Sequence, residues 1–250
     1  MEERKPFTST PIVEAVVDID CDIPQGFNLA DPQPFLAVWG DQYSQVQPVH
    51  GQQIRIESRN EGQVSHELSV GIIAQQFRTP EGNPVLQART AGFSFNRLKP
   101  YTTLDDYVVD IQRSWQLYCK VVKPLVIRNV RLKYINRLLL PMVNGRLELE
   151  DYFRVCPSLP QGADLDFLGF FQQHTTVERT TGHTAEIVLL AQPPENAHLP
   201  VIFDITVAAS ETAEPENWPW ILEKIQRLRV LKQSIFENTL TAKCLKPYQQ

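Results

Sequence analysis

Charged side chains that alternate along predicted strands are the residues best placed to do chemistry. In the strand expected at 11–19, Glu14 and Asp18 have the same parity, so a two-residue pleat projects both from one face. Two carboxylates on one face could bind a metal ion or act as general acid and base. Paired charges more often form salt bridges that serve structure, and both interpretations stay open.

A second strand, expected at 125–141, carries cations in the same manner. Arg131, Lys133 and Arg137 share one face, and apolar side chains such as Leu132 occupy the other. If the strands pair in one sheet, acids and bases meet on a common polar face. The candidate ligand-binding residues of this face are Glu14, Asp18, Asn96, Arg131, Lys133, Arg137 and Asp204, with Ser94 and Thr206 beside them.

Such a mixed face suits a zwitterionic ligand or a protein partner, whereas a nucleic-acid surface should be uniformly basic. The alternative is an internal ion-pair network between the two halves of the chain, because charges removed from water need partners. Asn136 has the opposite parity to Arg131 and Arg137, so we expect it on the covered side, where it needs hydrogen-bond partners.

Recognisable catalytic and cofactor signatures are missing from the sequence. The acidic run 18–22 resembles a calcium loop, but Ile23 and Leu29 stand where that loop requires glycine and glutamate. No serine lies in a G-x-S-x-G turn, and no glycine-rich phosphate loop occurs. The histidines have no ligand spacing and are His50, His66, His174, His183 and His198. We therefore expect no catalytic residue, no metal and no cofactor.

Charge is segregated along the chain although the net value is only −5. The segment 111–147 contains eight basic residues and no acidic one, and the segment 224–246 is basic apart from Glu237. Segregated charge can steer an anionic partner such as nucleic acid. The basic segments can equally pack beside acidic ones within the fold.

Cysteine usage and hydropathy predict a cytoplasmic protein. The four cysteines, Cys21, Cys119, Cys156 and Cys244, are far apart and form neither a zinc pattern nor a disulfide framework. The charged start of the chain is followed by no apolar signal region, and no apolar run approaches the length of a membrane span. We expect no membrane association.

A sequence pattern that occurs in both halves of the chain predicts the architecture. The triplet Ile-Gln-Arg occurs at 111–113 and again at 225–227, in amphipathic helices that each follow a similar strand. Thr102 or Thr103 can cap the first helix. The expected elements are strands at 11–19, 53–58, 65–77, 84–98, 125–141, 167–178, 184–191 and 200–208, with helices at 31–43, 104–122, 150–153 and 218–238.

The order of these elements is strand, short helix, three strands and long helix in each half. We therefore predict two α+β pseudo-repeats, 1–123 and 124–250, that form one compact unit. Their sheet should be mainly antiparallel with helices on one face, an arrangement similar to TATA-box-binding-protein-like and helix-grip folds. Likeness of fold carries no function.

Four sequence blocks resemble a sporadically distributed family of uncharacterised bacterial proteins of about this length. The blocks are PIVEA at 11–15, FSFNR at 93–97, RLKYINR at 131–137 and IFENTLT at 235–241. They cover both halves of the chain. The resemblance implies a shared fold and a recurrent centre of tyrosine, asparagine and arginine, and it assigns no reaction.

The sequence pattern accounts for a complete fold but contains no recognisable catalytic residues, which predicts a non-enzymatic binding module. It would recognise a protein partner or a second copy of itself through the polar sheet face and a basic helical edge. One alternative is an enzyme that holds an anion or phosphate with Arg131, Lys133 and Arg137 and uses Glu14 or Asp18 as base or metal ligand. Another is nucleic-acid binding through 111–147.

Overall fold

A single curved antiparallel sheet forms the centre of the fold in the computed structural model, which describes residues 10–59, 63–160, 165 and 167–248 and only the backbone of 52–70. The strand order is β2-β3-β4-β5-β1-β6-β9-β8-β7. The strands are β1 (Ile12–Asp22), β2 (Gln45–Arg59), β3 (Gln63–Arg78), β4 (Val85–Arg89), β5 (Gly92–Leu98), β6 (Val126–Pro141), β7 (Phe171–Val177), β8 (Thr184–Ala191) and β9 (His198–Ala209). The α+β class predicted from the sequence is confirmed.

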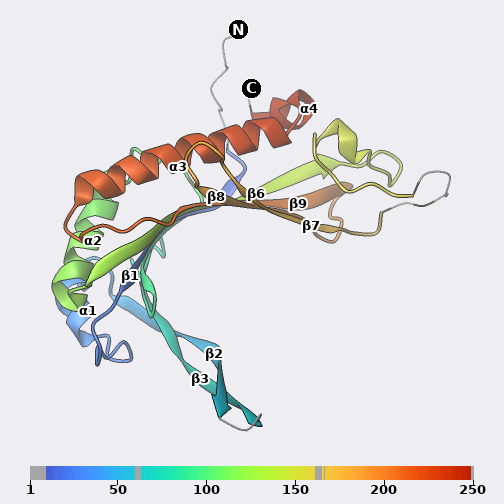
Figure 1. The fold of residues 1–250 in the computed structure, drawn as a ribbon. Helices are drawn as coiled ribbons and strands as arrows, with labels where there is room; N and C mark the ends of the chain where they lie inside the picture. Colours follow the sequence, from blue (N-terminus) through green and yellow to red (C-terminus); the bar gives the residue numbers. More distant parts are fainter. Residues whose placement is uncertain (1–9, 60–62, 161–164, 166, 249–250) are drawn as a thin grey trace.

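The three longest helices cover one side of this sheet, along its convex surface (Figure 1). The helices are α1 (Gln33–Trp39), α2 (Val108–Val122), α3 (Trp218–Thr239) and α4 (Ala242–Leu245), with 3-10 turns η1 (Leu149–Asp151) and η2 (Lys246–Tyr248). The concave side carries none of these helices, and we call it the open face. It comprises the side chains that alternate with the buried ones along each strand.

Alternation of apolar and polar residues explains why each strand presents these two sides. On β6, Leu132, Tyr134 and Leu138 are buried against the helices, and the residues between them point to the open face. Ile111 and Ile225, the first residues of the repeated Ile-Gln-Arg triplet, are both buried because each lies on the sheet-facing stripe of its helix.

One predicted strand, 84–98, is two strands. A tight turn at Thr90 and Ala91 separates β4 from β5, and Gly92 after it has a φ of +139°, which other residues rarely adopt. The first half therefore has four strands between α1 and α2, where we expected three. The spatial order of four strands is nevertheless the same in both halves, β1-β5-β4-β3 in the first and β6-β9-β8-β7 in the second. In the sequence, each set of four strands is followed by a long helix. Duplication itself stays a prediction.

The helix expected from 104 begins at Val108. Asp106 accepts hydrogen bonds from the Thr102 hydroxyl at 2.6 Å and from the Thr103 backbone at 3.1 Å. These bonds fold the segment before α2 into a turn, because a local carboxylate satisfies donors that a helix would otherwise use. Neither threonine caps α2, whose N-cap residue is Tyr107.

Both halves contribute to one hydrophobic core. Around α2, aromatic rings pack at distances such as 5.3 Å between Trp115 and Tyr118, and under α3 the rings of Phe203 and Phe236 stack at 5.8 Å. The Trp115 indole donates to the Pro215 carbonyl at 2.9 Å, which joins α2 to the segment before α3. The halves thus share apolar surface as well as the β1–β6 pairing.

Candidate functional site

A network of two carboxylates and two guanidinium groups occupies the centre of the open face. Asp18 and Asp20 project from β1, Arg89 from β4 and Arg131 from β6. The β1–β6 register sets Asp18 directly opposite Arg131, so the pair spans the junction between the two halves. Strand pairing therefore creates the network from distant segments, since Asp20 is 69 residues from Arg89 and 111 residues from Arg131 in the sequence.

Short distances show that these four groups are mutually paired. Arg89 Nη2 lies 2.8 Å from Asp20 Oδ1 and 3.4 Å from Asp18 Oδ1. Arg131 Nη2 lies 3.2 Å from Asp20 Oδ1 and 3.5 Å from Asp18 Oδ2. The Ser94 hydroxyl also donates to Asp18. Because both carboxylates are more than four-fifths buried, their pairing is less screened than that of surface charges.

The other predicted site residues form separate pairs on the same face. Lys133 Nζ lies 2.9 Å from Asp204 Oδ2, and the Asn96 amide donates to Glu14 Oε1 at 3.0 Å. Arg137 Nη2 lies 2.8 Å from Glu195 Oε1. The structure thus places all seven predicted residues on the open face but gathers only Asp18 and Arg131 into the central network.

Sequence reasoning missed Asp20, Arg89, Asn129 and Glu195. Asp20 has the parity of Asp18 and lies just beyond the predicted strand end, so a longer strand would have included it. Arg89 has the opposite parity to Ser94 and Asn96, so a single strand over 84–98 would place it on the other face; the turn between β4 and β5 brings it to the same face. Asn129 has the parity of Arg131 and is the register partner of Asp20, to whose Oδ2 it donates at 3.2 Å.

The placement of Asn136 agrees with its predicted covered side. It is 1% exposed, and its amide donates to the Phe203 carbonyl at 3.0 Å. A buried amide bonded to the neighbouring strand fixes the β6–β9 pairing, which is a structural role.

Each predicted cation of the open face already lies beside a carboxylate, with the closest distances between 2.8 and 3.2 Å for Arg137, Lys133 and Arg131. A phosphate ligand would have to displace these internal acids. The geometry therefore gives the anion-handling alternative no free cation among these three residues.

The basic segment 111–147 does not form one surface. Lys120 is exposed on α2, on the helix side of the sheet, and Arg131 and Lys133 project from the open face. Nucleic acid would need these charges on one continuous surface. The sheet separates them.

Three cations of the basic run near the C-terminus are paired with acidic residues within the fold. Lys224 Nζ lies 2.7 Å from Glu211, Arg229 Nη1 2.8 Å from Asp105 and Lys243 Nζ 2.6 Å from Asp151. The side-chain hydrogen bond from Lys224 lowers the pKa of Glu211. These pairs support internal complementarity, which was the alternative to a basic helical edge.

Apolar side chains flank the charged centre of the open face toward β7. The strand registers align Arg137, Ile202, Leu190 and Phe171 in one row across β6, β9, β8 and β7. Leu190 is 39% exposed and Phe171 is 63% exposed. The open face therefore combines partly buried ion pairs with accessible apolar surface.

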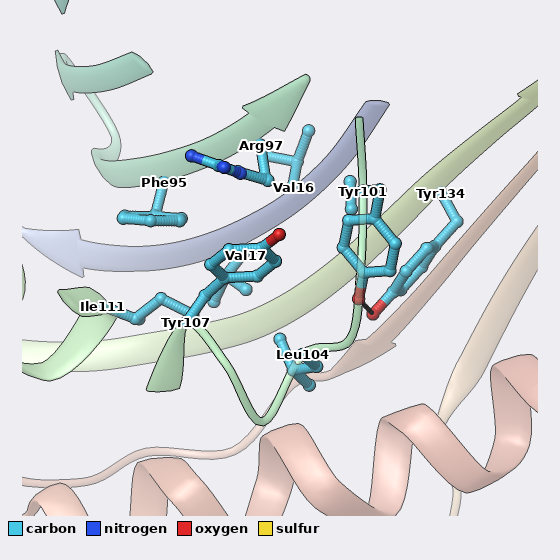
Figure 2. A pocket seen from close by; sticks show the side chains of 10 residues that line it. Val16, Val17, Phe95, Arg97, Tyr101, Leu104, Tyr107, Ile111 and Tyr134 are labelled. Carbon is cyan, nitrogen blue, oxygen red and sulfur yellow. Dashed lines mark hydrogen bonds between the residues drawn. The ribbon is translucent and has the colours of Figure 1, made fainter. Parts of the chain in front are cut away.

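A small cavity lies between the helix side of the sheet and the segment before α2. Figure 2 shows a space bordered by Arg97, Tyr101, Tyr107 and Tyr134, in which the Tyr101 and Tyr134 hydroxyls are hydrogen-bonded at 3.2 Å. Its volume of about 10 Å³ is close to the minimum for one water molecule. A substrate does not fit there.

A larger hollow of about 290 Å³ lies where the loop after β6 meets the segment before β7. Its lining is mainly apolar and includes Met142, Leu147, Phe167 and Leu199. Arg146 is the one charged side chain among the described lining residues, which therefore provide no pair of groups for general acid–base chemistry.

Among the described residues, no three histidine, cysteine or acidic side chains gather as metal ligands. Within the same part of the chain, no helix has both the length and the hydropathy to cross a membrane. A scan of protein-family models finds no match to this sequence, and a comparison with curated proteins finds none either.

Proposed function

We propose that this protein is a non-enzymatic binding module whose open face holds a polypeptide partner. The observation that carries the proposal is the open face itself, which none of the described helices covers (Figure 1). This face joins a partly buried charge network to exposed apolar residues. Protein interfaces combine apolar cores with polar rims in this way.

The chemistry of the face favours a polypeptide partner. Phe171 and Leu190 offer contacts to apolar side chains, and the Lys133–Asp204 pair offers both signs of charge within 2.9 Å. A polypeptide with apolar and charged side chains matches this surface. The acids Asp18, Asp20 and Asp204 would repel a phosphate backbone.

We place this binding in the cytoplasm. The four cysteines are free thiols, and burial raises the pKa of Cys21 to about 11 and of Cys244 to about 12. Buried protonated thiols are compatible with a reducing compartment and give the protein no reactive thiolate there.

The test is selection of binders from a displayed random-peptide library on the immobilised protein, followed by titration of synthetic peptides. The informative variant combines Lys133→Asp with Asp204→Lys, because the exchange preserves the ion pair and inverts its direction. We expect affinity for the selected peptides to fall at least about tenfold, since juxtaposed like charges cost binding energy.

The matched control is Lys120→Glu, which changes an exposed charge on α2, away from the open face. It should leave the affinity unchanged. Peptides that bind the exchanged variant and the wild type equally well would contradict the proposal, as would a selection that enriches no sequence.

A further inference from the structure

Strand β7 is the outermost strand at one end of the sheet, and its outer edge is free of any described strand. Ala191 N donates to Phe170 O at 3.0 Å and Glu178 N donates to His183 O at 2.8 Å, both in the β7–β8 register. In an antiparallel pair, hydrogen-bonded positions alternate. Residues 172, 174 and 176 therefore direct their backbone groups toward β8, and 171, 173, 175 and 177 direct theirs outward.

This edge lacks the features that usually protect an edge strand. The β7 sequence, FQQHTTV, has no proline and no acidic, lysine or arginine residue, and its β8 register has no bulge. The other edge strand, β2, contains Pro48 and a register shift between Val49 and His50. Phe171 and Val177, at the two ends of β7, are 63% and 58% exposed.

The β7 sequence is complementary to itself in the antiparallel direction. With a twofold axis at His174, Phe171 meets Val177 of the second copy, Gln172 meets Thr176 and Gln173 meets Thr175. An aromatic residue opposite a β-branched residue is a favourable cross-strand pair. Each glutamine faces a threonine, so an amide meets a hydroxyl, and no acidic, lysine or arginine side chain enters the pairing.

The backbone parity agrees with the same axis. Each outward-directed residue, 171, 173, 175 or 177, meets another outward-directed residue, so the pairing forms about eight backbone hydrogen bonds. His174 meets His174 at a position without backbone bonds, where side chains approach most closely. Centring the axis elsewhere on β7 would leave some of its seven residues unpaired.

We propose that two copies of this chain associate through β7, antiparallel and centred on His174, to form one continuous sheet. The association is isologous, since the same strand serves both partners. Side chains 171, 173, 175 and 177 lie on the open face, so the two open faces become one surface. This inference concerns the edge of the sheet and stands independently of the proposed peptide binding.

Sedimentation velocity over a wide concentration range tests the association. A seven-residue edge buries less than a standard interface, so we expect a dimer whose dissociation constant is roughly micromolar. His174→Lys and His174→Glu each place like charges opposite one another on the axis and should weaken dimerisation by roughly tenfold or more. An equimolar mixture of the two variants should restore it, because Lys then meets Glu.

Thr176→Lys is the matched control. Thr176 is exposed on the same strand and the same side of the sheet as His174, but its partner in the dimer is Gln172. Its substitution should leave the dimer largely intact. Circular dichroism verifies that each variant is folded. A wild-type monomer at every concentration, or a dimer that His174→Lys does not weaken, would refute the inference.

Discussion

The ammonium group of Lys232 lies 4.2 Å from the centroid of the Tyr134 ring, beneath α3. Lys232 is 9% exposed, and its Nζ also donates to Gln233 Oε1 at 3.2 Å. Burial lowers the pKa of Lys232 to about 8, with Arg229 contributing in the same direction. A lysine of this kind can be a nucleophile or base in an enzyme. The cavity beside Tyr134, at about 10 Å³, is too small for a substrate.

Lys232→Met should stabilise the protein at pH 7. The folded-state pKa of Lys232 is below the unfolded value of 10.5, so the unfolded chain binds more protons between pH 8 and 10.5. The lysine therefore costs stability below pH 8, and this cost disappears as the pH rises through that window. After allowance for the lost cation–π contact, the gain at pH 7 should be about 1–2 kcal/mol.

Urea unfolding of wild type and Lys232→Met at pH 7 and pH 10 measures this difference. The gain should shrink or reverse at pH 10, whereas Lys120→Met on the exposed side of α2 should show no such dependence. If the variant were less stable than wild type by the same amount at both pH values, burial of the charged Lys232 would not lower the free energy of unfolding.

Arg89→Met should destabilise the fold by about 2–4 kcal/mol, because it removes one partner from a largely buried charge network. Among the described residues, Asp18 and Asp20 would retain only Arg131 as a cationic partner, and the Phe93 carbonyl would lose a donor at 3.0 Å. The free energy of unfolding in urea measures the loss.

Arg128→Met provides the comparison for Arg89. Arg128 pairs with Asp22, but its side chain is 54% exposed, so solvent screens the pair and its loss should cost much less stability than the loss of Arg89. Equal effects of the two substitutions would mean that the central network contributes no more than a surface ion pair.

The composition of the open face was accessible from sequence where a strand alternates cleanly. The alternation of side chains predicts that Glu14 and Asp18 share one face of their strand and that Arg131, Lys133 and Arg137 share one face of theirs. The β1–β6 register confirms that both sets lie on the same face of the sheet. Parity depends only on local geometry, so it needs no knowledge of the partner strand.

The pairing within that face was not accessible. Arg89 reaches Asp20 only because the turn at Thr90 and Ala91 reverses the chain, and those residues lack the Asn-Gly or Asp-Gly signal of a tight hairpin. Glu195 meets Arg137 through a loop whose path is set by tertiary packing. Such contacts require the register between strands, which one sequence does not specify.

Gly92→Ala tests the turn that divides β4 from β5. A Cβ at Gly92 would lie 2.2 Å from the Ile19 carbonyl oxygen on β1, at a φ of +139°. The substitution should cost about 3 kcal/mol or more, because it adds a backbone clash to an unfavourable conformation.

Gly82→Ala is the matched control, since Gly82 has a φ of +78° but open space around its Cβ position. Its cost should be about 1 kcal/mol. Thermal unfolding followed by circular dichroism ranks the two variants. Similar losses at both glycines would contradict the close approach of β5 to β1.

The two halves of the chain should unfold in one transition. Trp39 and Trp115 lie in the first half and Trp218 and Trp220 in the second, and these are all four tryptophans. Variants that retain only Trp39 or only Trp218 report on each half separately. Because β1 pairs with β6 and the core is continuous, the two halves should unfold together. In each variant, the urea midpoint from tryptophan fluorescence should therefore equal the midpoint from circular dichroism. Separate midpoints for fluorescence and circular dichroism within either variant would show that residues before and after about 123 are independent folding units.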